Sequence, residues 1–461
     1  MTNKDNSYQN WIHFDFKGMH PSESRLVEWL SWVRDNGFSG IVLEYEDRLP
    51  WKTFEGTWRP GFELDVWQRI WRHCAKIGLE VTPLIQTYGH LECLLKHKRW
   101  AHLRCGKHVN LLCPLHPEIR PLLKSWIEEV VALHPASEYL HVGLDEVYHM
   151  GECQVCQKRA AELSLGKMGL LLEHASFVCE TVSKLGKRPI IWADMFLHSG
   201  NTGLLQQMPA DTVICEWTYT GDVGKGTRQL AEITPNALMG ASAIRRSFPS
   251  FQMVADVTVQ VDNVCAWHVA AAEQPAVKIL LHTLWARSRG LSALYGPWEG
   301  WLPAFQVAGR KGRNLSSAME QGMALLSQGL NSNNYEDLER YVAQLQELSA
   351  EPDLEKRALK WWELALRYHA ELLIGQYYSL HTLSLRASNS WMGEDPDLTF
   401  ESSEILRKLR ERLQQIQDEV KEFFTLHEWS NGEEYLESRF GGLEAALAAI
   451  EKISSAEARN S

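Results

Sequence analysis

Short runs of apolar and β-branched residues alternate with amphipathic stretches up to about residue 300. Such runs, bounded by turn residues, predict buried strands. We expect strands near Trp11–Phe16, Gly40–Tyr45, Leu79–Gln86, Tyr139–Leu144, Arg188–Asp194, Thr212–Trp217, Ala237–Ser242 and Lys278–Trp285. Eight strands that alternate with helices predict a parallel sheet closed into a (β/α)₈ TIM barrel. A doubly wound open sheet is the alternative, but no Gly-x-Gly-x-x-Gly follows the first strand.

The stretches between these runs have helical periodicity. Ser22–Asn36 starts with a capping serine and ends before Gly37, and Asp65–Lys76 and Pro117–Leu133 follow the same pattern. Cys156–Leu185 predicts one longer helix. Hydrophobic spacing and terminal signals of this kind are typical of helices that cover a sheet.

The alternation stops after about Asn314, and the rest of the chain is charged, poor in glycine and helical in period. Leu354–Ser384 and Ser403–Thr425 are examples. The aromatic pair Trp361–Trp362 is expected in the core or at a domain interface rather than at a ligand. We therefore predict a catalytic barrel over residues 1–314 and a smaller all-helical C-terminal domain over residues 315–461.

Polar and aromatic residues gather where the predicted strands end. Since every second side chain of a strand shares a face, the following residues belong together: His13 with Asp15 and Lys17, Glu44 with Glu46, His141 with Asp145, Trp192 with Asp194, Trp217 with Tyr219, and Trp285 with Arg287. Barrel enzymes carry their chemistry at the carboxyl ends of the strands. The pattern therefore predicts a site at that end.

Two adjacent carboxylates, Asp145 and Glu146, follow the fourth run, and Gly143 leaves room beside them. Glycoside hydrolysis needs a pair of carboxyl groups, one to protonate the leaving oxygen and one to manage charge at the sugar. An adjacent acidic pair is common in proteins, so it indicates catalysis only together with its surroundings.

Composition narrows the class of protein. The 461 residues are 45% hydrophobic, which suffices for a large core, and the formal charge of −11 without a basic stripe argues against nucleic acid or an anionic membrane as partner. The N-terminus has no apolar signal core, and nine scattered cysteines suit a reduced protein, so we expect a cytoplasmic location. Cys153-x-x-Cys156 is the one close cysteine pair in sequence, and we interpret it as a structural thiol pair rather than a metal or redox site.

Several segments, in order, resemble family 20 glycoside hydrolases, the β-N-acetylhexosaminidases, and most of all their hexosaminidase D branch. They are Ile12–Gly18, Ile41–Asp47, Pro83–Glu92, the His-x-Gly-x-Asp-Glu motif of His141–Glu146, Met239–Ala243 and Leu284–Arg287. The resemblance covers roughly residues 10–300. Two positions depart from the pattern of many secreted relatives, which have a second glycine at the position of Leu144 and a carboxylate at the position of Arg287.

The resemblance implies an exo-acting, retaining enzyme that removes terminal β-linked GalNAc or GlcNAc, with GalNAc favoured, and that needs no cofactor or metal. In this family the 2-acetamido oxygen of the substrate is the nucleophile, an exception to the two-carboxylate scheme. Asp145 matches the residue that orients the acetamido N–H, and Glu146 matches the general acid and base. Tyr219 is the candidate hydroxyl for the acetamido oxygen.

Further residues are candidates for binding substrate: Asp15, Glu44, Glu46, Gln86, His90, His141, Trp192, Asp194, Trp217, Trp285 and Arg287. The three tryptophans would wall the acetamido methyl group and the sugar face. Asp194, Glu44 and Glu46 have a structural alternative as buried, paired carboxylates. Gln86 has one as a residue that closes a loop, and the two histidines have one as supports of the site. A homodimer is a further expectation.

Two other functions stay open at this point. An ordinary double-displacement glycosidase would use a protein carboxylate such as Asp194 as nucleophile. A non-catalytic amino-sugar-binding barrel would have kept the pocket without the chemistry.

Overall fold

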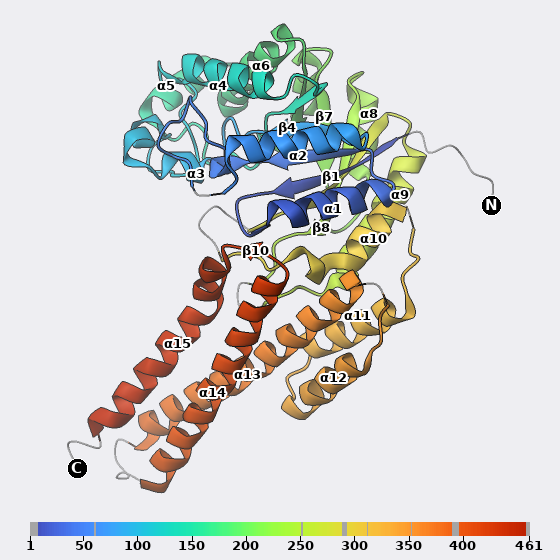
Figure 1. The fold of residues 1–461 in the computed structure, drawn as a ribbon. Coiled ribbons are helices and arrows are strands. Elements are labelled where there is room, and N and C mark those ends of the chain that lie inside the picture. The colour runs from blue at the N-terminus through green and yellow to red at the C-terminus, as the bar shows by residue number, and fades with distance from the viewer. Residues whose placement is uncertain are drawn as a thin grey trace.

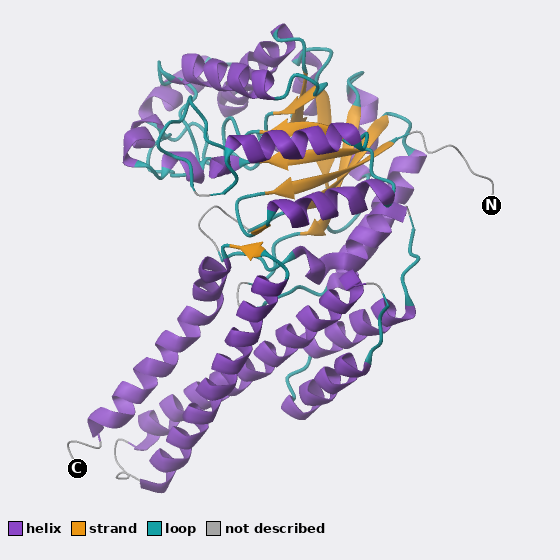
Figure 2. Ribbon diagram, viewed as in Figure 1, coloured by secondary structure: helices purple, strands orange, loops and turns teal. Residues whose placement is uncertain are grey.

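Eight parallel strands form a closed barrel in the computed structural model of the protein, which describes residues 8–59, 61–249, 252–287, 293–310, 312–351, 353–389 and 396–457. In order around the barrel they are β1 (Gln9–Asp15), β3 (Gly40–Glu44), β4 (Glu80–Leu84), β5 (Tyr139–His141), β6 (Arg188–Trp192), β7 (Val213–Trp217), β8 (Leu238–Arg245) and β9 (Val277–Leu284). β1 pairs with β9 in parallel, Trp11 opposite Leu281, and this pairing closes the sheet. The predicted TIM barrel is confirmed, and the alternative of an open sheet is wrong. Figure 2 shows the strands with helices around them.

Helices cover the outside of the barrel (Figure 1). They are α1 (Glu23–Asp35), α2 (Leu64–Lys76), α4 (Ile119–Leu133), α5 (Gln154–Glu162), α6 (Gly166–Lys184), α8 (Lys225–Ile233), α9 (Val257–Glu273) and α10 (Leu302–Arg310). Shorter helical segments lie in the connections: η1 (Glu46–Arg48), α3 (Glu92–Leu95), η2 (Lys98–Leu103), α7 (Asp194–His198), η3 (Thr202–Gln207) and η4 (Trp298–Trp301). As predicted, the Ser22 side chain caps α1 by accepting a hydrogen bond from the Arg25 amide over 3.3 Å.

Two predicted boundaries are wrong for the same reason, a left-handed backbone. The single helix expected over Cys156–Leu185 is two helices, because Leu163 is extended and Gly166 has φ of +55°. The strand expected up to Leu144 ends at His141, because Gly143 and Leu144 have φ of +72° and +80°. A positive φ fits neither a helix nor a strand.

Side chains fill the interior of the barrel. Trp11, Val42, Leu84, Ile190, Cys215, Met239 and Leu281 belong to one buried cluster inside the sheet. Gly40 is required there, since a Cβ atom at this position would lie 2.6 Å from the Trp11 ring. Because the interior is packed, only the rim of the barrel can hold a substrate.

The C-terminal region is helical, which confirms the predicted fold class. It consists of α11 (Ser317–Leu330), α12 (Tyr335–Glu347), α13 (Asp353–Asn389), α14 (Pro396–Leu426) and α15 (Gly432–Glu457). Figure 1 shows α13, α14 and α15 extending away from the barrel. Trp361 and Trp362 of α13 are fully buried, and Trp362 Nε1 donates to the Gly300 carbonyl over 2.9 Å, so this pair joins α13 to the barrel. A short strand, β10 (Trp429–Ser430), pairs antiparallel with β2 (His20–Pro21). Among the described residues, no helix combines the length and the apolar character that a membrane span requires.

Candidate active site

A pocket of about 220 Å³ opens at the carboxyl ends of the barrel strands, near the lower end of the range for small-molecule sites, roughly 300 Å³. Its lining contains nine residues that the sequence indicated: Gln86, His90, Asp145, Glu146, Trp192, Trp217, Tyr219, Trp285 and Arg287. It also contains four that sequence reasoning missed as site residues, Lys17, Glu92, Arg246 and Ser247. Asp15, Glu44, Glu46, His141 and Asp194 are buried but do not line it.

The turn after β5 places the two adjacent carboxylates. Gly143 has φ of +72°, a conformation that favours glycine, and a Cβ atom there would also displace the Gln86 side chain, since it would lie 2.0 Å from Oε1. Leu144 and Glu146 also have positive φ, +80° and +50°, so the chain turns sharply here. The Asp145 side chain is 11% exposed and that of Glu146 is 42% exposed. The pair therefore offers one enclosed carboxylate and one that reaches the pocket mouth.

His90 bridges the two carboxylates. Its Nε2 lies 3.2 Å from Asp145 Oδ2 and 3.4 Å from Glu146 Oε2. Burial alone would lower the pKa of His90, but the Asp145 charge and the hydrogen bonds with both carboxylates raise it well above its usual value. A cationic imidazole thus offsets negative charge at the site.

Asp194 supports this turn from outside the pocket lining. Its Oδ2 accepts a hydrogen bond from the Glu146 amide over 3.0 Å. Burial, together with the charges of Asp145 and Glu146, raises the pKa of Asp194 to about 7. This placement favours the structural alternative for Asp194 over sugar binding.

A buried ion network fills the rim between β1 and β3. Lys17 Nζ lies 2.9 Å from Glu44, 3.4 Å from Glu46 and 3.5 Å from Asp15. Burial would lower the pKa of Lys17, but the three carboxylates raise it well above its usual value. The same lysine and His13 hold the pKa of Glu44 low against its burial, whereas burial and the Glu44 charge raise that of Glu46 to about 8.

The members of this network have structural partners as well. Asp15 accepts hydrogen bonds from the Lys17 and Ala286 amides, each over 2.8 Å, and so ties the end of β1 to the end of β9. Gln86 Nε2 donates to Glu44 Oε1 over 3.2 Å, which orients Gln86 at the pocket wall. Asp15, Glu44 and Glu46 thus position Lys17 and Gln86.

His141 is likewise a support. It is fully buried, accepts a hydrogen bond from the Gly143 amide over 3.1 Å, and its ring centroid lies 4.4 Å from that of Trp192. Burial lowers its pKa to about 3, so the ring is neutral at physiological pH. It holds the turn and the tryptophan in place.

Aromatic side chains form the opposite wall. Trp192 and Trp285 have ring centroids 6.1 Å apart, and those of Trp217 and Tyr219 are 5.0 Å apart. Trp285 Nε1 donates to Tyr219 Oη over 2.9 Å. Burial raises the pKa of Tyr219, so the phenol keeps its proton and can donate it to a ligand.

The structure explains which lining residues the sequence could have indicated. Residue parity along the first strand places Lys17 on the same face as His13 and Asp15, so the sequence did indicate this residue. Glu92 ends a segment that carries the family resemblance. Arg246 and Ser247 follow a strand that runs three residues past its expected end at Ser242, so the parity pattern did not reach them.

Fold and site together define a barrel with an acidic pair on the rim and an aromatic wall, as in glycoside hydrolases. Residues 68–244, which contain β4 to β7 and all of β8 except its last residue, match the model of the glycosyl hydrolase family 20 catalytic domain. The chain is similar to human hexosaminidase D, with 30% identity over 310 residues and 61% of each chain covered, and to the bovine protein, with 29% identity over 299 residues, 61% of this chain and 86% of that one. It thus spans about three fifths of the length of the human relative.

Solved structures show the same fold. The exo-β-N-acetylglucosaminidase of Vibrio harveyi in complex with N-acetylglucosamine has a TM-score of 0.51 at 15% identity, over 68% of this chain and 55% of that one. A β-N-acetylhexosaminidase of Bacteroides fragilis has a TM-score of 0.50 at 16% identity, over 76% and 73%. The resemblance expected from the sequence is found again: residues 68–244 match the family 20 model, and the chain is similar to hexosaminidase D.

Proposed function

We propose that this protein is an exo-acting, retaining β-N-acetylhexosaminidase that removes terminal β-linked GalNAc or GlcNAc. One observation carries the proposal: the pocket brings Asp145, Glu146 and Tyr219 together, and Asp145 Oδ1 has no hydrogen-bond partner in the described part of the chain. An enclosed acceptor without a partner suits the N–H of an acetamido group, since a buried acceptor left unpaired costs free energy.

The first step forms the oxazolinium intermediate. Tyr219 donates its hydroxyl proton in a hydrogen bond to the acetamido oxygen, and Asp145 accepts the acetamido N–H. The oxygen attacks the anomeric carbon while the glycosidic C–O bond breaks, and Glu146 gives its proton to the leaving oxygen. Asp145 stabilises the positive charge that develops on the acetamido nitrogen.

The second step restores the enzyme. Glu146, now a carboxylate, takes a proton from water, and the water oxygen bonds to the anomeric carbon. The bond from the acetamido oxygen to that carbon breaks, so the sugar leaves with retained configuration. Because the Glu146 side chain is 42% exposed at the pocket mouth, it can reach both the leaving group and incoming water.

Two further points belong to the proposal. The small pocket suits one terminal sugar, with Trp192, Trp217 and Trp285 against its apolar face. Similarity to hexosaminidase D favours GalNAc over GlcNAc, two sugars that differ in the orientation of one hydroxyl. A site that hydrogen-bonds this hydroxyl can discriminate strongly.

The alternative nucleophile, Asp194, has less support. It does not line the pocket, and its Oδ2 is occupied by the Glu146 amide. A thiazoline mimic of the oxazolinium should inhibit the substrate-assisted enzyme strongly and a double-displacement enzyme poorly.

The test is a paired assay with nitrophenyl β-N-acetylgalactosaminide and β-N-acetylglucosaminide, repeated with an alkyl glycoside whose leaving group needs protonation. We expect Glu146→Gln to lose about 10²–10⁴ in kcat on the alkyl glycoside. Asp145→Asn should lose activity on every substrate. Glu128→Gln, on the exposed face of α4, is the matched control and should be unchanged.

Near-wild-type hydrolysis of the alkyl glycoside by Glu146→Gln would overturn the assignment. If the variants bound sugar like the wild type and none of the proteins hydrolysed any substrate, the barrel would be a non-catalytic binding module.

A further inference from the structure

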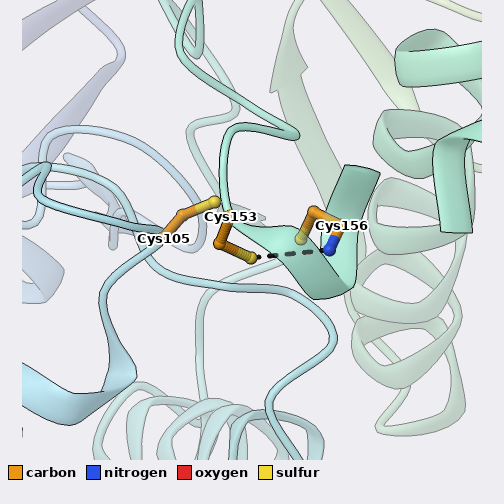
Figure 3. A group of neighbouring side chains, drawn as sticks. All are labelled: Cys105, Cys153 and Cys156. Carbon is orange, nitrogen blue, oxygen red and sulfur yellow. Dashed lines mark hydrogen bonds between the residues drawn. The ribbon is translucent and has the colours of Figure 1, made fainter. Parts of the chain in front are cut away.

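Four cysteines from two loops meet beside the candidate active site. Cys105 and Cys113 lie in the connection between β4 and α4, and Cys153 and Cys156 lie at the start of α5. The sulfur atoms of Cys105, Cys153 and Cys156 are all within 4.8 Å of one another (Figure 3). Cys113 Sγ lies 3.6 Å from the sulfur of Cys153 and 3.6 Å from that of Cys156. The thiol pair expected from the sequence is therefore part of a larger cluster.

Two of the distances between sulfur atoms match those of a tetrahedral metal centre. Zinc binds thiolates at about 2.3 Å, so an ideal tetrahedron places its sulfur atoms about 3.8 Å apart. The two distances of 3.6 Å are close to this value and far above the roughly 2.05 Å of a disulfide. All nine cysteines of the chain are free thiols in the structure.

The backbone around the cluster is built to hold the sulfur atoms. Cys105 N donates to the Leu111 carbonyl and Cys113 N to the Leu103 carbonyl, both over 2.8 Å, so the two cysteines lie at the ends of one tight loop. On the other side Cys153 caps α5, and the Cys156 amide donates to Cys153 Sγ over 3.5 Å, as the dashed line in Figure 3 shows. Such N–H donors stabilise a thiolate that ligates a metal.

Burial also suits a closed structural centre. Cys105, Cys113 and Cys156 are buried, and Cys153 is half-buried. Four neutral thiols, three of them buried, offer only weak hydrogen bonds to one another. Four thiolates around one divalent cation would satisfy every sulfur atom, and a Cys₄ set leaves no open position for a substrate.

We propose that Cys105, Cys113, Cys153 and Cys156 bind one Zn²⁺ ion, which fastens the loop that carries His90 to the loop that carries Asp145 and Glu146. The first loop is already folded on itself by hydrogen bonds of 3.1 Å, from the Leu91 amide to the Asn110 carbonyl and from the Leu112 amide to the Tyr88 carbonyl. The ion would therefore also restrict the position of His90. It is a structural centre, outside the catalytic chemistry, and it replaces the expectation of no metal.

The first experiment measures zinc in the purified wild type by elemental analysis, with no zinc added. We expect one ion per chain. Mercurial titration of the thiols should release the zinc, detected with a colorimetric indicator, and release should be complete when the four cluster thiols have reacted. Replacement by cobalt(II) should give the absorption of a tetrahedral cobalt–thiolate centre. None of these measurements depends on the fold of a variant.

Variants then assign the ligands. Cys113→Ser and Cys156→Ser should lose zinc and have a lower Tm than the wild type. Cys74→Ser and Cys179→Ser, which replace buried thiols outside the cluster, should keep one ion per chain. The proposal is overturned by wild type that takes up no zinc or cobalt, by full zinc content in the cluster variants, or by an intact mass that shows disulfides among these cysteines. Zinc content is independent of glycosidase activity, so this test and that of the proposed function fail separately.

Discussion

At the scale of single residues, Leu144 has a backbone conformation that normally belongs to glycine. Its φ is +80°, and its side chain is fully buried. A non-glycine residue in this region carries strain of about 1–3 kcal/mol, which the surrounding packing has to offset. This strained residue lies directly before Asp145, at a position where many secreted relatives have glycine. Glycine would adopt the conformation without strain, whereas Leu144 offsets the strain by packing its side chain in the core.

Substitution of Leu144 should reverse the usual order of alanine and glycine. Both variants lose a buried leucine, at about 2–5 kcal/mol. A glycine variant is ordinarily less stable than the alanine variant by about 0.5–1 kcal/mol. At a residue with positive φ, however, only glycine relieves the backbone strain. We therefore expect Leu144→Gly to have a higher free energy of unfolding in urea than Leu144→Ala. At the control position Leu123, buried in α4, Leu123→Ala should be more stable than Leu123→Gly. If Leu144→Ala were likewise more stable than Leu144→Gly, the prediction would be contradicted.

His90 should make stability depend on pH. Its folded-state pKa lies above the value of 6.5 for an unfolded chain. The stabilisation from its charged form is therefore fully present below pH 6.5 and is lost as pH rises through the folded-state pKa. We expect His90→Gln to cost about 1.5–3 kcal/mol at low pH, the range for hydrogen bonds to charged groups, and less as pH rises.

The check is the difference in unfolding free energy between wild type and His90→Gln across this pH range. His134 is the matched control, because burial lowers its pKa to about 4. The His134 contribution is present above pH 6.5 and is lost as pH falls, so His134→Gln should show the opposite trend. A His90 difference that does not change with pH would show that folding does not raise the pKa of this imidazole.

At the scale of elements, Lys17 joins β1 to β3 through buried charges. Its ammonium is the cation that lies against Asp15, Glu44 and Glu46. Removal of one partner from a buried ion group leaves uncompensated charge, at about 3–5 kcal/mol. Lys17→Met should therefore lower the free energy of unfolding by about this amount, measured in urea at neutral pH.

A second substitution separates charge from packing. Glu44→Gln in the Lys17→Met background removes one stranded carboxylate and should recover part of the loss. A Lys17→Met variant within 1 kcal/mol of the wild type would mean that the carboxylates take up protons at little cost.

The strands of the barrel could be predicted because the local pattern of apolar and polar residues determines where they form. Each is a short apolar run between polar connections, and all eight are found. Their ends were harder to predict, because a left-handed residue such as Leu144 or Gly166 leaves no sign in the hydrophobic pattern. The acidic pair was predicted from adjacent residues and a motif, and the aromatic wall from residue parity.

Contacts between distant segments could not be predicted from local pattern. Cys113 and Cys153 are 40 residues apart, and the seven residues between Cys105 and Cys113 give no familiar metal motif. The pocket residue Arg287 pairs with Glu434, 147 positions later in the chain. Such contacts exist only once the barrel has folded. The predicted domain boundary at residue 314 stays a prediction.

At the scale of the whole molecule, the C-terminal helices reach the rim of the pocket. Arg287 Nη2 lies 2.6 Å from Glu434 Oε1 at the start of α15. Arg59 lies 3.9 Å from the same carboxylate group and 2.6 Å from Asp47 of the barrel. Where many secreted relatives place a carboxylate at the position of Arg287, this chain has an arginine that pairs with a carboxylate of the C-terminal helices.

This ion pair should affect substrate binding more than stability. The Arg287 side chain is 5% exposed, but that of Glu434 is 42% exposed, so solvent screens the pair from the carboxylate side. We expect the pair to contribute about 1 kcal/mol, so Glu434→Gln should lower Tm only slightly. Arg287 lines the pocket, however, and loses the group that orients it. We expect KM for the nitrophenyl glycoside to rise several-fold at constant kcat, since substrate and transition state lose the same contact. Added salt should raise KM of the wild type toward that of the variant, because ions screen the charge of the solvent-facing Glu434 carboxylate. Glu437→Gln, exposed on the same helix, is the control, and equal KM values for the two variants would show that α15 does not shape the pocket.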